Sequence, residues 1–271
     1  MSSPADIEGL WARRAEVTER DLRARRLVEE TIDELDRGRL RVAEVDASGA
    51  VIVHEWLKLA ILLAFKVLGI SESELGPYRY CDRVPLKTKF DGVRVVPGAV
   101  VRWGSYLAPG VILMPSFVNI GGYVDEGTMV DTWATVGSCA QIGKRVHLSG
   151  GVGIGGVLEP PQASPVIIED DVFVGSRSMI VDGARVRRGA KLGAGVILTS
   201  STHVIDAETG AELPRGEVPE RAVVVNSSRV KSFPGGDFGM HCLLVLRTLP
   251  LGAEHDKLQL NDILRQHGVA T

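Results

Sequence analysis

Aliphatic residues recur at every sixth position through the middle of this 271-residue chain. An α-helix repeats every 3.6 residues and a strand every two, so neither alone gives a period of six. In a parallel β-helix, each hexapeptide forms one short side of a prism and points one aliphatic residue inward. Glycine follows several of these residues, as is typical of the left-handed form. The period therefore predicts a mainly β fold, a left-handed parallel β-helix. The two runs are Ile112, Val118, Val124, Val130, Val136, Ile142, Leu148 and Ile154, then Ile168, Val174, Ile180, Val186, Leu192 and Leu198.

The segments on either side of the repeat divide the chain into three parts. We expect a helical N-terminal domain over 1–93, the β-helix over 94–205 and a small C-terminal β/α extension over 206–271. Within the flanks, helical spacing covers 8–37 and 54–68, with two short strands over 41–53. A hairpin turn at 206–210, strands at 223–225 and 243–246 and a helix over 258–267 follow the repeat. The phase break at 158–165 predicts a loop that leaves the coil, a natural wall or lid for a site.

Composition excludes several classes of protein. A net charge of −3 with 45% hydrophobic residues disfavours a nucleic-acid or membrane partner. The longest apolar run, 57–70, is interrupted by two lysines and is too short to cross a bilayer. The early residues are charged and predict no signal peptide, so we expect a cytoplasmic protein. Three widely spaced cysteines predict neither disulfides nor a zinc site, and no metal or redox cofactor is expected.

The flat faces of such a prism favour a homotrimer with long clefts between subunits. Such clefts suit an extended ligand such as a pantetheine arm. The period does not by itself identify a reaction, because the fold also carries γ-class carbonic anhydrases and passive trimerisation modules. A carbonic anhydrase needs three histidines on zinc, whereas His147 and His203 lie far apart in the sequence. A non-catalytic trimeric scaffold stays an open alternative.

Long motifs in the chain resemble one family of enzymes. The stretch TMVDTWATVGSCAQIGK at 128–144 is the most distinctive of them. This stretch and several others along the chain resemble tetrahydrodipicolinate N-succinyltransferases, which are hexapeptide-repeat acyltransferases. The resemblance implies transfer of succinyl from succinyl-CoA to the amino group of tetrahydrodipicolinate, in its opened 2-amino-6-oxopimelate form, during lysine and diaminopimelate biosynthesis. The matching stretches cover nearly the whole chain: 40–44, 54–58, 94–97, 114–121, 123–144 and 147–160.

Asp131 is the main candidate for catalysis. It follows the core position Val130, so its side chain should point outward, toward a subunit interface. An amine with a pKa near 10 is only about one part in a thousand free base at pH 7. A carboxylate can bind the ammonium form and help to remove its proton as the nitrogen attacks. The resemblance implies this role for Asp131; the alternative is a turn aspartate that accepts from backbone N–H groups.

Two arginines are candidates for binding a dicarboxylic amino-acid acceptor. The resemblance implies that Arg94 binds an acceptor carboxylate, and we expect Arg102 to share this role. Guanidinium groups suit carboxylates because the pairing is bidentate. The alternative for either residue is a solvated surface arginine.

The acyl-CoA donor should lie along the coil. Small residues there let backbone N–H groups approach the tetrahedral oxyanion. No serine, cysteine or histidine has a triad context, which favours direct attack in a ternary complex over an acyl-enzyme. The candidates are Ser149, Gly150, Gly151, Ser176 and Arg177 for the thioester, and Arg229 and Lys231 for the CoA phosphates unless these two are simply solvated.

Two positions depart from the family pattern. Met179 stands where the family usually has a glutamate with a catalytic role, and 225–232 differs in a region implicated in coenzyme binding. Methionine can neither accept a proton nor bind an ammonium group. These departures leave open another donor such as acetyl-CoA, another acceptor, or a divergent paralogue of secondary metabolism such as a tabtoxin-type acyltransferase.

Overall fold

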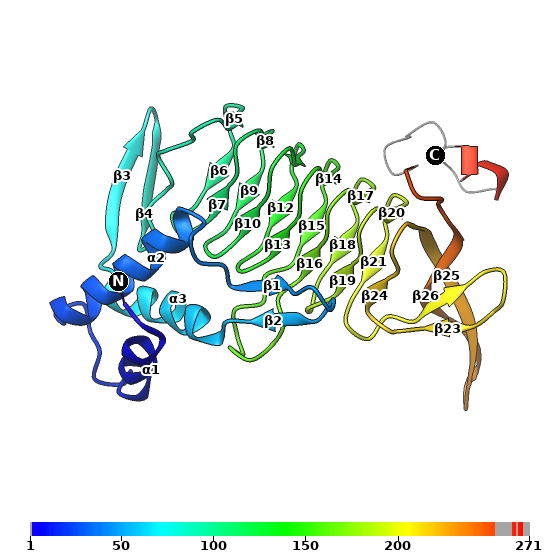
Figure 1. Ribbon diagram of the computed structural model, residues 1–271, viewed down its shortest axis with the longest axis horizontal. Helices are drawn as coiled ribbons and strands as arrows, with labels where there is room; N and C mark the ends of the chain where they lie inside the picture. Colours follow the sequence, from blue (N-terminus) through cyan, green and yellow to red (C-terminus); the bar gives the residue numbers. More distant parts are fainter. Residues whose placement is uncertain (1, 253–261, 264, 268–271) are drawn as a thin grey trace.

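The computed structural model describes residues 2–252, 262–263 and 265–267. Figure 1 shows an N-terminal group of helices, a row of stacked coils, and a long hairpin beyond the last coil. The mainly β architecture and the stacked parallel strands confirm the predicted hexapeptide β-helix. The expected helix over 258–267 lies mostly outside the described residues.

The N-terminal part contains three helices and two hairpins. The helical pattern over 8–37 forms two helices rather than one, because Asp21 caps the second by accepting from the Ala24 N–H at 2.9 Å. The predicted strands within 41–53 are present, whereas the second hairpin lies in a stretch expected to be helical. The elements are α1 Pro4–Ala12, α2 Leu22–Asp36, β1 Ala43–Val45, β2 Val51–Val53, α3 Glu55–Val67, β3 Ser71–Leu75 and β4 Tyr78–Asp82.

The coil has three faces of parallel strands, which we call faces 1, 2 and 3. Face 1 contains β5 Arg94–Val95, β8 Ile112–Leu113, β11 Met129–Val130, β14 His147–Leu148, β17 Phe173–Val174 and β20 Lys191–Leu192. Face 2 contains β6 Val100–Val101, β9 Phe117–Val118, β12 Thr135–Val136, β15 Gly153–Ile154, β18 Met179–Ile180 and β21 Ile197–Leu198. Face 3 contains β7 Tyr106–Leu107, β10 Tyr123–Val124, β13 Gln141–Ile142, β16 Ile167–Ile168, β19 Arg185–Val186 and β24 Glu217–Val218.

The second residue of each strand on faces 1 to 3 points into the prism, and it is buried in all of them except β5, where Val95 is partly buried. This confirms the predicted core positions with one exception, Ile112. Leu113 is the buried residue there, at 0% exposure, and it pairs with Val130, while Ile112 pairs with Met129 on the outside. The corner after Leu113 is one residue short, so the period slips between Leu113 and Val118. Because both 112 and 113 are aliphatic, the period could not choose between them.

Two excursions leave the coil. The predicted loop at 158–165 departs between β15 and β16, at the corner of faces 2 and 3. The second excursion, between β21 and β24, contains β22 Val204–Asp206 and β23 Glu212–Leu213, joined by the predicted turn. The coil then resumes, since β24 pairs with β19 and β25 Ala222–Phe233 pairs with β20. The stack therefore extends past residue 205, where its end was expected. The excursion interrupts the six-residue repeat, so the later coil could not be recognised in the sequence.

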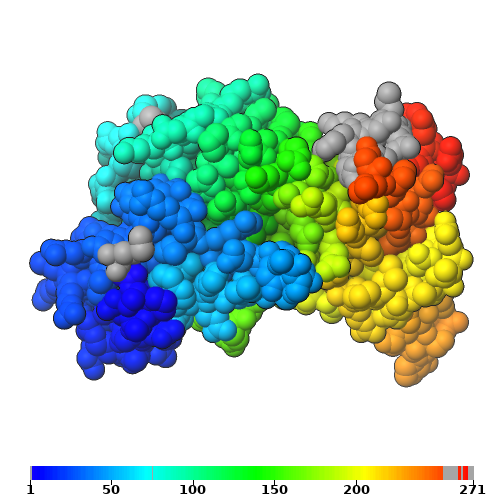
Figure 2. All heavy atoms as spheres, in the orientation of Figure 1, coloured from blue at the N-terminus to red at the C-terminus, as the bar shows by residue number. Residues whose placement is uncertain are grey.

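The N-terminal part covers face 3 and leaves faces 1 and 2 open within the described chain. Figure 2 shows the hairpin of β1 and β2 lying across the coils. The Arg41 Nε–H donates to Gln141 Oε1 at 2.8 Å, and its guanidinium lies 4.0 Å from the Tyr123 ring centroid. Farther along, Arg185 Nη1 donates to the Gly49 carbonyl at 2.9 Å. Any cleft formed with another subunit would therefore involve the two remaining faces.

Candidate active site

Most predicted site residues meet at one corner of the prism, between faces 1 and 2, which we call the 1–2 corner. Successive turns stack there through backbone hydrogen bonds: Gly151 N–H to the Thr132 carbonyl at 2.9 Å, and Arg177 N–H to the Gly150 carbonyl at 3.0 Å. The stacking aligns residues from three coils along one edge. The predicted residues on this edge are Asp131, Ser149, Gly150, Gly151, Ser176 and Arg177.

The third residue of each of these turns has a left-handed backbone. Its φ is 61° at Trp133, 70° at Gly151 and 57° at Arg177. A residue other than glycine loses roughly 1–2 kcal/mol in this conformation. At Gly151 a side chain would also meet Arg177, whose Cγ lies 3.2 Å from the position a Cβ would take. In this conformation the side chain points outward, and Trp133 is consequently 77% exposed.

Asp131 is held in one orientation. Its Oδ1 accepts from the Thr132 N–H at 2.6 Å, and its Oδ2 lies 3.7 Å from Nε2 of His147. His147 belongs to β14 and packs against Phe173, with ring centroids 5.4 Å apart. His147 was not among the predicted site residues, although it lies one coil after Met129 on the same face. The site thus presents a carboxylate beside an imidazole.

The two arginines occupy different places. Arg94 lies on face 1, in register with Ile112 and then Met129, which puts its backbone two strand spacings, about 9.6 Å, from that of Met129. Arg102 lies at the corner of faces 2 and 3. It pairs with Asp82 and donates to Asn119 Oδ1 at 3.2 Å. Within one chain, the structure brings Arg94 to the face of Asp131 but does not bring Arg102 there.

Met179 lies on face 2, directly after the 1–2 corner. A Cβ built on Gly153 would lie 2.4 Å from the Met179 Sδ, so the thioether covers the glycine of the neighbouring strand. Met179 is 43% exposed, and Val100 and Ile197 are exposed on the same face. Face 2 therefore presents an apolar surface beside the carboxylate.

Arg229 and Lys231 lie on the arm formed by β25 and β26 Gly236–Thr248, beyond the last coil. Arg229 Nη1 lies 3.3 Å from Glu212 Oε2. Hydrogen bonds from Arg215 and then His203 lower the pKa of the Glu212 carboxyl to about 2. Lys231 lies 5.2 Å from the Phe233 ring centroid, opposite Phe238. One side of the arm thus carries basic and aromatic groups together.

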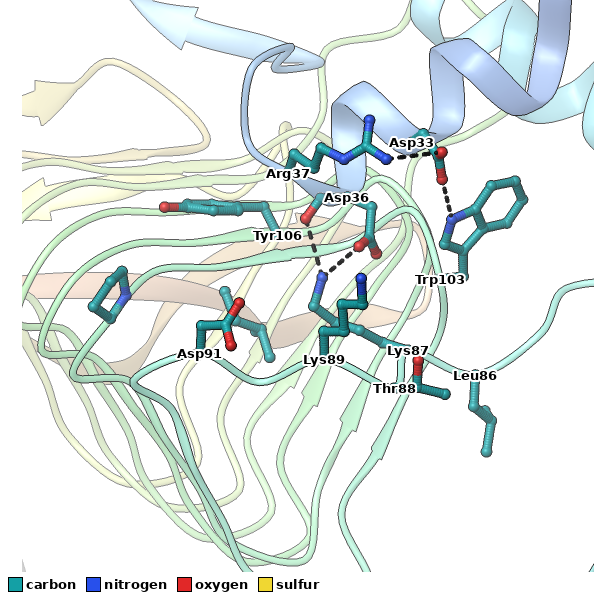
Figure 3. A pocket seen from close by; sticks show the side chains of 12 residues that line it. Asp33, Asp36, Arg37, Leu86, Lys87, Thr88, Lys89, Asp91, Trp103 and Tyr106 are labelled. Atoms are coloured by element: carbon teal, nitrogen blue, oxygen red, sulfur yellow. Dashed lines mark hydrogen bonds and ion pairs between the residues drawn. The ribbon is translucent and has the colours of Figure 1, made fainter.

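A cavity of about 630 Å³ lies elsewhere, between α2 and the first coil (Figure 3). Its polar walls are largely paired with each other. Lys87 Nζ donates to Asp36 Oδ2 at 2.7 Å, and Trp103 Nε1 donates to Asp33 Oδ1 at 2.9 Å. None of the predicted site residues lines it. We interpret this region as the joint that fixes the N-terminal part to the coil.

Other chemistries find little support in the described residues. No group of three or more histidine, cysteine, aspartate or glutamate side chains there is arranged to hold a metal ion. Burial raises the pKa of the Cys139 thiol to about 12, so this cysteine is a poor nucleophile near neutral pH. Over the same residues, no helix has the length and apolar character needed to cross a bilayer.

Two family models match the sequence. Residues 3–67 match "Tetrahydrodipicolinate N-succinyltransferase N-terminal", and residues 165–200 match "Hexapeptide repeat of succinyl-transferase". Among solved structures, a putative 2,3,4,5-tetrahydropyridine-2-carboxylate N-succinyltransferase from Campylobacter jejuni superposes with a TM-score of 0.52 at 17% identity. That match covers 80% of this chain and 62% of the other, and it supports the fold alone.

Curated relatives match almost from end to end. The 2,3,4,5-tetrahydropyridine-2,6-dicarboxylate N-succinyltransferase of Ruegeria pomeroyi is 48% identical, over 96% of this chain and 97% of its own. The enzyme of the same name from Bartonella tribocorum is 51% identical, over 89% and 88%. The one from Pasteurella multocida is 47% identical, over 98% of both chains. This chain therefore belongs to the tetrahydrodipicolinate N-succinyltransferase family of hexapeptide-repeat acyltransferases.

Proposed function

We propose that this protein transfers succinyl from succinyl-CoA to the amino group of tetrahydrodipicolinate, in its opened 2-amino-6-oxopimelate form, in lysine and diaminopimelate biosynthesis. The similarity to enzymes of that name over nearly their whole length carries the proposal. The reaction is direct attack of the amine on the thioester in a ternary complex. The protein acts in the cytoplasm, without a metal and without a nucleic-acid or membrane partner.

The acceptor lies across face 1. Asp131 binds its ammonium group, and Arg94 binds a carboxylate at the other end of the molecule. The spacing of about two strands between their positions suits a linear dicarboxylic amino acid. Arg102 serves the acceptor only if it belongs to the cleft of a neighbouring subunit, because in its own chain it faces Asp82.

The donor lies along the 1–2 corner. The small residues Ser149, Gly150 and Gly151 let the thioester approach the backbone, with Ser176 and Arg177 on the next coil. The CoA phosphates and adenine reach the arm, where Arg229 and Lys231 supply positive charge and the neighbouring aromatic rings supply a stacking surface.

The enzyme works as a homotrimer. Face 2 exposes the apolar side chains of Val100, Met179 and Ile197, which we call the apolar ladder, and Trp133 projects from the corner beside it. A neighbouring subunit would cover these apolar side chains. The loop at 158–165 leaves its own coil at the opposite edge of face 2 and is held there by Lys58 of α3, which donates to the Ala163 carbonyl at 2.7 Å. It would therefore serve as a lid for the neighbour's cleft.

Met179 supports a second candidate, an N-acyltransferase of secondary metabolism, of the tabtoxin type, that uses acetyl-CoA or another amino-acid acceptor. Its thioether makes the surface beside the corner apolar where an acid would bind a cation. A non-catalytic trimeric scaffold is the third candidate.

One experiment separates these candidates. Purified protein is mixed with succinyl-CoA or acetyl-CoA and with tetrahydrodipicolinate or L-2-aminopimelate, and release of CoA thiol is followed. We expect rapid release only with succinyl-CoA and either acceptor. A preference for acetyl-CoA would favour the second candidate. No acceptor-dependent release with either donor, from protein that is trimeric in solution, would contradict the proposed function and favour the scaffold.

A further inference from the structure

We propose that His147 is the base that accepts the proton from the acceptor's ammonium group, and that Asp131 orients the imidazole and stabilises its charged form. This proposal rests on the proposed N-acyltransferase function. It gives His147, which lies in the matching stretch 147–160 but was not among the predicted site residues, a catalytic role beside Asp131.

The geometry at the corner supports the pairing. His147 Nε2 lies 3.7 Å from Asp131 Oδ2, while the other carboxylate oxygen is held by the Thr132 N–H. Phe173 packs against the imidazole from the next strand. The side chains of His147 and Asp131 are 25% and 29% exposed, so a ligand on face 1 can reach both, yet both are partly shielded from water.

Position, rather than pairing alone, distinguishes His147. Two other imidazoles in the described chain lie beside a carboxylate: His54 at 3.0 Å from Glu44, and His203 at 2.7 Å from Glu212. The first pair lies in the N-terminal part and the second in the excursion near the arm. The His147 pair alone lies at the edge where the stacked serine and glycine turns make room for a thioester.

Basicity favours the imidazole over the carboxylate. An amine of pKa about 10 is some six units above an ordinary aspartate but only about 3.5 units above an ordinary histidine. General bases work best when their pKa lies near the working pH, which is the range of an imidazole. A neighbouring carboxylate stabilises the imidazolium that forms, without taking the proton itself.

The proton balance is complete without any further reactant. The imidazole of His147 takes one proton from the ammonium group, and the freed nitrogen lone pair forms a bond to the thioester carbonyl carbon. The tetrahedral oxyanion then collapses and breaks the carbon–sulfur bond. The imidazolium returns its proton to the leaving sulfur, which gives the CoA thiol. The amide nitrogen loses its second proton to water, so one proton is released per turnover.

The other charged groups near His147 lie along the same face or at its borders. Lys191 is two strands away, and its ammonium donates to the Asp171 carbonyl at 2.7 Å. Arg94 is three strands away in the other direction. Arg145, just before β14, pairs with the Asp171 carboxylate at 2.7 Å, and Arg177 lies at the next turn of the 1–2 corner. Asp131 is the carboxylate whose Oδ2 lies 3.7 Å from the ring nitrogen.

The test is the pH dependence of kcat with saturating succinyl-CoA and L-2-aminopimelate, in the full-length protein. In the wild type we expect kcat to fall below neutral pH as the imidazole is protonated, and we call this decline the acid limb. In His147→Gln we expect kcat to fall by about 100-fold or more, loss of this acid limb, and an unchanged KM for succinyl-CoA. In Asp131→Asn we expect a lower kcat with the limb retained but moved toward acid, because the imidazolium has lost its carboxylate.

The opposite pattern overturns the proposal. If Asp131 itself were the base, Asp131→Asn would abolish the limb and His147→Gln would keep it. His54→Gln is the matched control, since it breaks another histidine–carboxylate pair, and it should keep wild-type kcat and limb. His147→Ala with added imidazole supplies a second readout: recovery of kcat supports the proposal, and its absence in a folded variant contradicts it. A wild type without turnover refutes the proposed function itself, whereas an active wild type matched by His147→Gln refutes only this proposal.

Discussion

Cys139 should give this protein a loss of stability in alkali that a single substitution removes. The thiol is fully buried, in the apolar cluster between α3 and the coil, and burial raises its pKa from 9.0 to about 12. Between these values the unfolded chain releases the thiol proton while the folded chain keeps it. The unfolded state therefore binds fewer protons, and the free energy of unfolding falls as pH rises through this window.

The size of the effect follows from the two pKa values. A pH of about 10.5 is some 1.5 units above the pKa of this thiol in the unfolded chain, whereas the thiol in the folded chain is still protonated. One unit corresponds to about 1.4 kcal/mol, so the wild type loses about 2 kcal/mol through this group between neutral pH and pH 10.5. Cys139→Ala loses about 1 kcal/mol at neutral pH through the small cavity it leaves, but it has no thiol to titrate.

The assay is urea unfolding at about pH 7.5 and about pH 10.5, under reducing conditions and at one protein concentration, because oligomers unfold in a concentration-dependent manner. We expect the variant to be less stable than the wild type at the lower pH and more stable at the higher pH. Lys58 is present in both proteins; burial lowers its pKa, and the neighbouring Cys139 acts in the opposite direction. Cys81→Ala, at an exposed cysteine, is the control. An equal stability difference at both pH values would refute the reasoning.

Three further predictions concern the site, the interface and the core. Asp131→Asn should lower kcat by about 100-fold or more while the protein keeps its melting temperature, and thiol release with near wild-type kcat would contradict its role. Ile197→Glu places a charge on the exposed apolar ladder of face 2 and should separate trimers into monomers in light scattering, whereas Ser201→Glu, in the exposed excursion, should not. Leu148→Ala removes a fully buried side chain from the prism and should cost about 2–5 kcal/mol in urea unfolding, whereas a loss below 1 kcal/mol would mean that the coil collapses around the cavity.

The coil could be predicted because one physical requirement, an inward aliphatic residue on each side, repeats along the sequence. The shift in the period at Ile112 could not be predicted, because Ile112 and Leu113 both satisfy that requirement. Only the pairing of Leu113 with Val130 decides between them. The later coils escaped because the excursion between β21 and β24 interrupts the count. Local pattern therefore determines the repeat but not its register or its end.

The site was predicted where a motif carries it and missed where stacking creates it. The outward position of Asp131 follows from its place after Val130. His147 joins it only because one coil brings 129 and 147 side by side, a contact between residues distant in sequence. Arg102 could not be assigned for the same reason, since its partner Asp82 lies in a hairpin that was not predicted within the helical N-terminal domain.

The joint between the N-terminal part and the first coil has a consequence for solubility. A parallel β-helix ends in open strand edges, which are templates for pairing with other chains. Here the Lys87 N–H donates to the Val101 carbonyl at 2.8 Å, and Asp36 Oδ1 accepts from the Gly104 N–H at 3.0 Å, so part of the first edge is already occupied. Removal of residues 1–90 would uncover the edge at these two places. The N-terminal part thus helps to prevent copies of the β-helix from pairing end to end and growing into fibres.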